Sequence, residues 1–170
     1  MFFQQTFVGI SKKMKIFYDI NELNRRLREL KEKKIVFTNG VFDIIHPGHI
    51  DLLEFAQKSG NCLVVGINDD DSVRRLDKGA GRPVFPLAER MEVLAAIEFV
   101  DFIIPFSQDT PLDLINGLYR VDVLVKGGDY KPAEVVGRTE VEEAGGKLLL
   151  FEFKPGYSTS SLIERIKSQW

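Results

Sequence analysis

Two histidines stand three residues apart in the stretch His46-Pro47-Gly48-His49, and they are the only histidines in the chain. Proline suits the first position of a helix, because its missing N–H would have no partner there in any case. Gly48 and His49 still present free backbone N–H groups at the positive end of the helix dipole. Gly48 has no Cβ, so a phosphate can approach the backbone closely. The stretch predicts a phosphate site with both imidazoles on one side of the first helical turn.

Two other interpretations of the histidines stay open at this stage. Two imidazoles at this spacing suit zinc, but the chain has no third histidine, and its one cysteine, Cys62, lies within an apolar run. Alternatively, His46 caps the helix and His49 only faces solvent. We favour phosphate chemistry because the turn offers free N–H groups as well as imidazoles.

The histidines follow an apolar run at 35–37 that is β-branched at Ile35 and Val36, which is typical of a strand buried on both faces. Thr38-Asn39-Gly40 ends this run, and from Ile50 the apolar residues take helical spacing. The histidine turn therefore joins a strand to a helix. It lies at the carboxyl end of the strand, where open α/β sheets bind their ligands.

The rest of the chain alternates between strand-like runs and helical spacing. We expect strands at 35–38, 63–67, 102–105, 121–125 and 148–153, with helices between them. This alternation predicts an α/β fold: a single Rossmann-like, doubly wound domain at 34–170 with a five-stranded parallel sheet. We expect a lead-in helix within 14–33 that opens at Asp19 and packs on the sheet edge, after a loosely attached leader at 1–13.

Two further strand ends carry groups suited to phosphate. Lys126 follows the fourth expected strand and is followed in turn by Gly127 and Gly128, so it should face the ligand edge. Ser158-Thr159-Ser160-Ser161 opens the last helix. One hydroxyl is enough to cap a helix, and we expect the others to join the free N–H groups in a second phosphate cradle.

Other charged residues allow more than one interpretation. Asp69-Asp70-Asp71 could bind a metal, but acids at the start of a short helix serve ordinarily as caps and dipole partners, and we prefer that interpretation. Lys78 and Arg82 lie in a turn-rich segment. They are either solvated cations or the charged groups of a mobile lid beside the phosphate site.

Composition limits the classes of partner. The 170 residues carry a net charge of −2 with a pI near 5.8, which disfavours nucleic acid and anionic membranes as partners. No stretch reaches the ~18 apolar residues of a membrane span. One cysteine excludes an internal disulfide and suits a reducing cytoplasm, where we expect the protein to act. A Walker P-loop, a dinucleotide-binding Gly-x-Gly-x-x-Gly and a nucleophile elbow are all missing from the sequence.

The motifs together resemble those of the cytidylyltransferase-like nucleotidyltransferases of the His-x-Gly-His type, and within them the stand-alone heptose 1-phosphate adenylyltransferases. The resemblance runs from about Lys15 to the C-terminus. It rests on the histidine motif and on the following stretches: Thr38-Asn39-Gly40-Val41-Phe42-Asp43, Arg82-Pro83-Val84, Glu89-Arg90, Lys126-Gly127-Gly128-Asp129-Tyr130 and Gly156-Tyr157-Ser158-Thr159-Ser160.

The resemblance implies transfer of AMP from ATP to D-glycero-β-D-manno-heptose 1-phosphate, giving ADP-heptose and pyrophosphate, a precursor step of lipopolysaccharide. It implies His46, His49 and Lys126 as catalytic residues, with Asp43, Lys78 and Arg82 toward the acceptor or in the mobile loop. It also implies a homodimer, and general phosphate chemistry adds Mg²⁺ held mainly by ATP phosphates and water. The nucleotide-binding set that it implies is Thr38, Asn39, Gly40, Phe42, Gly48, Gly127, Asp129, Ser158, Thr159 and Ser160.

Two alternatives remain. One keeps the fold and changes the substrates to CTP and glycerol 3-phosphate, since nothing in the residues themselves distinguishes adenine from cytosine. The other is a non-catalytic nucleotide-binding module. It predicts that replacing either histidine leaves function nearly unchanged.

Overall fold

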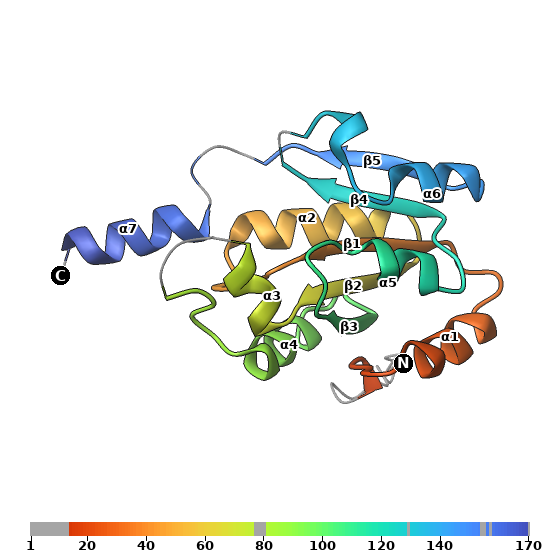
Figure 1. Ribbon diagram of the computed structural model, residues 1–170, viewed down its shortest axis with the longest axis horizontal. Helices are drawn as coiled ribbons and strands as arrows, with labels where there is room; N and C mark the ends of the chain where they lie inside the picture. Colours follow the sequence, from red (N-terminus) through yellow and green to blue (C-terminus); the bar gives the residue numbers. More distant parts are fainter. Residues whose placement is uncertain (1–13, 77–80, 129, 154–155, 157, 170) are drawn as a thin grey trace, which may run out of the picture.

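A computed structural model describes residues 14–76, 81–128, 130–153, 156 and 158–169. These residues form a parallel sheet with helices on both of its faces (Figure 1). The strands and helices in chain order are α1 (Ile20–Glu29), β1 (Ile35–Gly40), α2 (Pro47–Lys58), β2 (Cys62–Asn68), α3 (Asp70–Arg75), α4 (Leu87–Ala95), β3 (Phe102–Phe106), α5 (Leu112–Gly117), β4 (Val123–Gly127), the 3₁₀ turn η2 (Pro132–Glu134), α6 (Arg138–Glu143), β5 (Lys147–Phe151) and α7 (Thr159–Gln169).

The sheet has five parallel strands in the order β3-β2-β1-β4-β5, which confirms the predicted doubly wound sheet. The chain builds outward from β1 to β3, then returns to the other side of β1 to add β4 and β5. Such a reversal leaves a crevice at the carboxyl ends of the two central strands. The crevice lies between β1 and β4, whose register pairs Val36 with Val123 and Phe37 with Leu124.

Two apolar clusters lie on the two faces of the sheet. One face is covered by α2 and α4, whose Leu53 and Met91 pack in a cluster with Val36 of β1. The other face is covered by α1, α5 and α6, and its cluster includes Leu23 of α1 and Phe37 of β1. Neighbouring strand residues point to opposite faces, so the continuous apolar run of β1 serves both clusters.

The position of α1 differs from the prediction. Asp19 does cap α1, since its side chain accepts a hydrogen bond from the N–H of Asn21 at 2.9 Å. The helix packs on a face of the sheet, however, and not on its edge. The edge position belongs to the residues before it, where Ile16 bridges to Ile103 of β3 in parallel register.

The acidic stretch at 69–71 follows the capping interpretation. Asp69 accepts a hydrogen bond from the N–H of Ser72 at 2.7 Å and caps α3. Asp70 pairs with Arg90, and Asp71 pairs with Arg74 on the surface. Within the part of the chain that the structure describes, no three histidine, cysteine or acidic side chains come together as a metal site.

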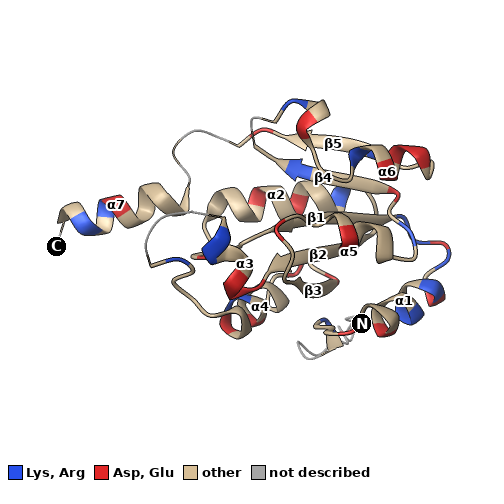
Figure 2. Ribbon diagram, in the orientation of Figure 1, with Lys and Arg blue, Asp and Glu red and all other residues tan. Residues whose placement is uncertain are grey.

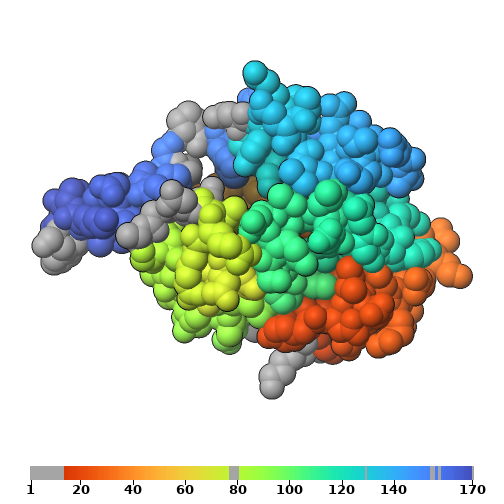
Figure 3. All heavy atoms as spheres, in the orientation of Figure 1, coloured from red at the N-terminus to blue at the C-terminus, as the bar shows by residue number. Residues whose placement is uncertain are grey.

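Charges of both signs occupy the same surface helices, including α1, α6 and α7 (Figure 2). This mixture is expected of a solvated surface. Among the described helices, none combines the length and the apolar character needed to cross a membrane. The last helix, α7, stands out from the body of the molecule and has no buried residue (Figure 3).

Candidate active site

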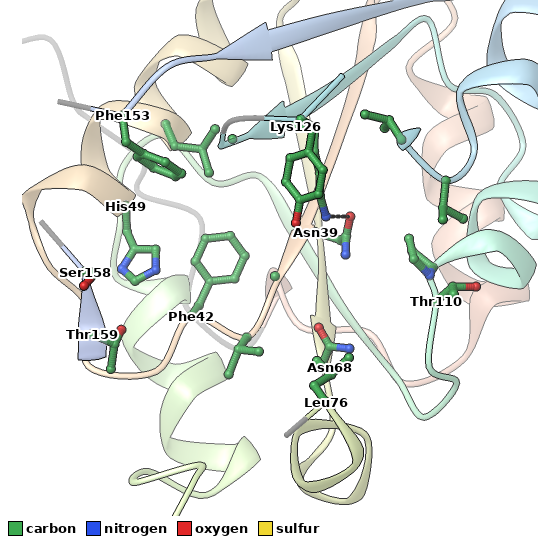
Figure 4. A pocket seen from close by; sticks show the side chains of 18 of the residues that line it. Asn39, Phe42, His49, Asn68, Leu76, Thr110, Lys126, Phe153, Ser158 and Thr159 are labelled. Atoms are coloured by element: carbon green, nitrogen blue, oxygen red, sulfur yellow. Dashed lines mark hydrogen bonds between the residues drawn. The ribbon is translucent and has the colours of Figure 1, made fainter. Parts of the chain in front are cut away.

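A cavity of about 500 Å³ opens at the carboxyl edge of the sheet (Figure 4). Groups from β1, α2, β4 and the start of α7 meet there, so segments far apart in sequence share one site. The predicted site residues on its wall are Asn39, Gly40, Phe42, His46, His49, Arg82, Lys126, Gly127, Ser158, Thr159 and Ser160.

The two histidines form one stacked unit at the start of α2. Their ring centroids lie 3.8 Å apart with an interplanar angle of 27°. The turn closes when the N–H of His49 donates to the carbonyl of His46 at 2.9 Å. In return, His49 Nδ1 accepts a hydrogen bond from the backbone N–H of His46 at 3.4 Å. Because Nδ1 is an acceptor, a neutral His49 carries its proton on Nε2 and can donate it to a ligand.

Both imidazoles are held neutral. Burial, with smaller effects of the nearby His46 and Arg82, lowers the pKa of His49 to about 4, and Asp43 opposes this shift. Burial also lowers the pKa of His46, against the effect of a backbone hydrogen bond. At neutral pH the pair therefore offers hydrogen-bond donors and no formal positive charge.

The loop before α2 has an unusual backbone. Phe42 and Ile44 both take positive φ angles of 49°, which side chains other than glycine seldom adopt. Such a conformation persists only where surrounding contacts enforce it. Phe42 is buried and its ring centroid lies 5.4 Å from that of His49, so the strained residue supports the imidazole directly.

Asp43 lies between Phe42 and Ile44 in the sequence, and its hydrogen bonds hold this part of the loop in place. Its carboxylate accepts hydrogen bonds from Arg82 Nε at 2.7 Å and from the backbone N–H groups of Val84 at 2.8 Å and Phe85 at 3.0 Å. Its carbonyl accepts another from the hydroxyl of Thr159 at 2.8 Å. Asp43 thus ties the histidine loop to the segment at 82–85 and to α7.

These contacts correct two expectations about the acceptor side. Asp43 was expected to face the acceptor sugar, but it is 1% exposed and both of its oxygens already have partners. For Arg82 the two expectations were a solvated cation or a charged group of a mobile lid beside the phosphate site. Arg82 lines the cavity, but its side chain is 8% exposed and paired with Asp43. The reason is that a buried carboxylate requires a cation and donors close by.

Lys126 comes from β4 and reaches the same cavity. Its ammonium donates a hydrogen bond to Asn39 Oδ1 at 3.1 Å and lies 5.5 Å from the centre of the Tyr130 ring. Strand β4 extends to Gly127, two residues beyond the predicted end, so Lys126 belongs to the strand and not to the following loop. A Cβ on Gly127 would lie 2.6 Å from the Phe153 ring, which explains the glycine here.

The hydroxyl residues at the start of α7 have different hydrogen-bond partners. Ser158 Oγ accepts from the N–H of Ser161 at 3.0 Å, which is the expected cap. The Thr159 hydroxyl donates its hydrogen bond to the carbonyl of Asp43. Ser160 lines the cavity, and its hydroxyl makes no hydrogen bond to any residue that the structure describes. The predicted cradle therefore has fewer available hydroxyls than its sequence suggests.

Besides Asp43, two predicted residues that the structure describes do not appear on the wall. Thr38 is fully buried and its hydroxyl has no partner among the described residues, and Gly48 is buried within the first turn of α2. The prediction that these two contact nucleotide does not fit their positions. Lys78 and Asp129 lie outside the described residues, as does the proposed leader at 1–13.

The structure also adds wall residues that the sequence did not single out for the site. They come from the end of β2, the C-cap of α3 and the segments after β3, β4 and β5: Asn68, Leu76, Asp109, Thr110, Pro111, Tyr130, Glu134, Val135, Val136 and Phe153. Asn68 and Tyr130 lie within a few residues of the ends of expected strands, where loops return to the same edge. Leu76 follows a helix and Phe153 lies in an expected strand, so only the fold places these two on the wall.

Arg90 is a second buried hub behind the wall. It is 1% exposed and donates to the carbonyls of Val41 at 2.7 Å and Asn68 at 2.9 Å, and to Asp70 Oδ1 at 2.7 Å. It therefore joins the ends of β1 and β2 behind the cavity. Within a helical pattern an arginine ordinarily faces solvent, so only the fold reveals this role.

The all-parallel sheet, with a cavity at its carboxyl edge lined by groups suited to phosphate, defines a Rossmann-like fold of the kind that binds nucleotides. Residues 37–165 match the family model described as cytidylyltransferase-like, and the chain belongs to this family. The chain is accordingly a nucleotidyltransferase.

A curated relative agrees with this assignment, and two solved structures share the fold. The bifunctional protein HldE of Sodalis glossinidius is 52% identical over 135 residues, which are 79% of this chain and 28% of that protein. The chain thus spans less than a third of this relative. A lipopolysaccharide core biosynthesis protein from Thermoplasma volcanium is 24% identical with a TM-score of 0.59, over 74% of this chain and 99% of the other. A pantoate-beta-alanine ligase from Francisella tularensis, complexed with beta-gamma ATP and beta-alanine, is 18% identical with a TM-score of 0.60, over 89% and 73%. These two structures show the fold.

Proposed function

We propose that the chain transfers AMP from ATP to D-glycero-β-D-manno-heptose 1-phosphate, releasing pyrophosphate and ADP-heptose. The observation that carries the proposal is the meeting of His49, Lys126 and the start of α7 in one cavity. The choice of a heptose acceptor rests on the sequence motifs and on the similarity to HldE.

The reaction needs positioning more than proton transfer. An oxygen of the sugar phosphate, already anionic, forms a bond to the α-phosphorus of ATP while the bond from that phosphorus to the bridging oxygen of pyrophosphate breaks. No general base is required. The enzyme must hold both anions in line and stabilise the charge that builds on the phosphoryl oxygens.

Each group has a role in this scheme. The Nε2–H of His49 and an N–H of the His46 ring donate to phosphoryl oxygens, and the neutrality of His49 keeps its proton in place during the reaction. Lys126 supplies the positive charge at the centre of the cavity. The first turn of α7, with the Ser160 hydroxyl, receives the departing pyrophosphate.

We expect Mg²⁺ to accompany ATP. The described residues offer no trio of histidine, cysteine or acidic side chains to hold a metal by themselves. The ion would therefore be held by the phosphates of ATP and by water, and its chemistry is to neutralise those phosphates.

An activity panel tests the proposal. ATP and CTP are each offered heptose 1-phosphate and glycerol 3-phosphate, and pyrophosphate release is measured. We expect release only with ATP and heptose 1-phosphate. Release with CTP and glycerol 3-phosphate would replace the proposed substrates and keep the reaction class.

A further inference from the structure

Two asparagines stand at the carboxyl ends of neighbouring central strands, and both line the cavity (Figure 4). Asn39 lies in β1 and Asn68 ends β2. An asparagine amide can present either an NH₂ donor or an oxygen acceptor to a ligand, and its other hydrogen bonds decide which.

The amide of Asn39 presents its donor. Its Oδ1 accepts the hydrogen bond of Lys126, so its NH₂ is left for the cavity. A donor beside an ammonium suits a phosphoryl oxygen.

The amide of Asn68 presents its oxygen. Its Nδ2 donates to Ser72 Oγ at 2.9 Å, and Ser72 Oγ donates in turn to the carbonyl of Gln108 at 2.9 Å. A carbonyl can only accept, so the single proton of the Ser72 hydroxyl points to Gln108. Toward Asn68 the hydroxyl can therefore only accept, and the group that faces it must be the NH₂. These two hydrogen bonds therefore turn Asn68 Oδ1 away from Ser72.

This oxygen is held firmly and has no donor among the residues that the structure describes. Asn68 is 4% exposed and Ser72 is fully buried. The carbonyl of Asn68 is also held by Arg90 at 2.9 Å. An immobile acceptor at a cavity wall repels phosphate oxygens, which carry no proton, and binds hydroxyl groups.

The place of Asn68 in the cavity selects between the hydroxyls of the substrates. In-line displacement puts the attacking and leaving oxygens on opposite sides of the α-phosphorus. In Figure 4, His49, Ser158 and Thr159 lie on one side of Lys126 and Asn39, whereas Asn68, Leu76 and Thr110 lie away from them. If pyrophosphate leaves toward α7, the acceptor approaches from the side of Asn68.

We propose that Asn68 Oδ1 accepts a hydrogen bond from a hydroxyl of the acceptor sugar phosphate, which makes Asn68 a specificity-determining residue. This inference rests on the proposed adenylyl transfer to a sugar 1-phosphate. It adds that the protein recognises a hydroxyl of the acceptor through Asn68 Oδ1, whose orientation is set by the hydrogen bonds to Ser72 and Gln108.

The test is a thermodynamic cycle that combines removal of the Asn68 amide with removal of one hydroxyl of the acceptor. Wild type and Asn68→Ala are assayed with heptose 1-phosphate and with a series of its monodeoxy analogues. For Asn68→Ala we expect kcat/KM for the acceptor to fall about tenfold or more, with the KM for ATP unchanged. One deoxy analogue should cost the wild type a similar factor and cost the variant nothing further, because the lost partner is the same.

Ser72→Ala serves as a second variant that keeps Asn68. Without the hydroxyl the amide is free to turn, and we expect a smaller loss of kcat/KM for the acceptor alone. Far-ultraviolet circular dichroism and the affinity for ATP show that both variants fold.

The outcomes separate this inference from the proposed function. If the wild type is active and each deoxy analogue lowers kcat/KM by the same factor in wild type and in Asn68→Ala, the role of Asn68 is overturned and the proposed function stands. The same assay is run with 2′-deoxy-ATP and 3′-deoxy-ATP. If Asn68→Ala cancels the effect of a missing ribose hydroxyl and not that of a missing acceptor hydroxyl, the proposed role is also overturned. A wild type that uses no sugar 1-phosphate overturns the proposed function, and the role of Asn68 with it.

Discussion

Lys126 Nζ lies 3.1 Å from Asn39 Oδ1, and this hydrogen bond joins the carboxyl ends of β4 and β1 at the point where the strand order reverses. The contact brings the ammonium to the cavity that the histidines also line. A single contact between distant segments thus completes the proposed phosphate site.

Replacing Lys126 should remove most of the activity. We expect Lys126→Ala to lower kcat by about 10²-fold or more, because the positive charge acts on the phosphoryl group as its charge builds. Lys131→Ala is the matched control, since this exposed lysine lies outside the cavity wall and should keep wild-type turnover. Steady-state pyrophosphate release measures both, and equal rates in the two variants would contradict the role of Lys126.

The histidine pair distinguishes an enzyme from a binding module. We expect His46→Ala and His49→Ala each to reduce kcat by about 10²-fold, while the proteins still bind ATP. Calorimetric titration with ATP measures the binding separately from turnover. Normal turnover in both variants would sink the catalytic scheme and favour a non-catalytic nucleotide-binding module.

The stability of the protein should depend on pH through His49. The pKa of this residue is lowered from 6.5 to about 4 in the folded state. The unfolded chain therefore takes up the proton first as pH falls, so stability is lost between about pH 6.5 and 4, by at most about 3 kcal/mol. Urea unfolding of wild type and His49→Gln at pH 7 and pH 5 measures this. The variant should lose less stability than wild type over that interval, and an equal loss would contradict the assignment.

The buried pair of Asp43 and Arg82 should matter more for stability than a surface pair. Asp43→Asn leaves a buried guanidinium without its counter-ion, and we expect a loss of about 3 kcal/mol or more. The control is Glu142→Gln, which breaks the exposed pair with Arg138 and should cost less than about 1 kcal/mol. Chemical denaturation gives both values. Similar losses would show that the contacts of Asp43 do not hold the histidine loop.

Removing divalent cations should affect turnover and leave the fold intact. We expect EDTA to abolish pyrophosphate release and Mg²⁺ to restore it, while the melting temperature of the substrate-free protein stays the same. The reason is that the described side chains form no metal cage. Stoichiometric zinc in the purified protein, or a large fall in melting temperature with EDTA, would instead support a metal held by the chain.

Local sequence was enough to determine much of this protein. The β-branched run at 35–37 is a buried strand, Asp19 and Asp69 cap their helices, and the histidines share one helical turn as expected. These features depend on contacts within a few residues, which spacing and residue type already contain. The alternation of strands and helices also predicted that Lys126 and the histidines would meet at one edge of the sheet.

Tertiary structure decided which side chain at that edge faces the ligand. Thr38 and Asn39 are neighbours in β1, so they point to opposite faces, and only the packing of the sheet shows that Asn39 lines the cavity while Thr38 is buried. The partners of Asp43 lie about forty residues further along the chain. The orientation of the Asn68 amide depends on Ser72 and on a carbonyl at Gln108. Such contacts join distant segments, and residue spacing carries no record of the hydrogen bonds that those segments exchange.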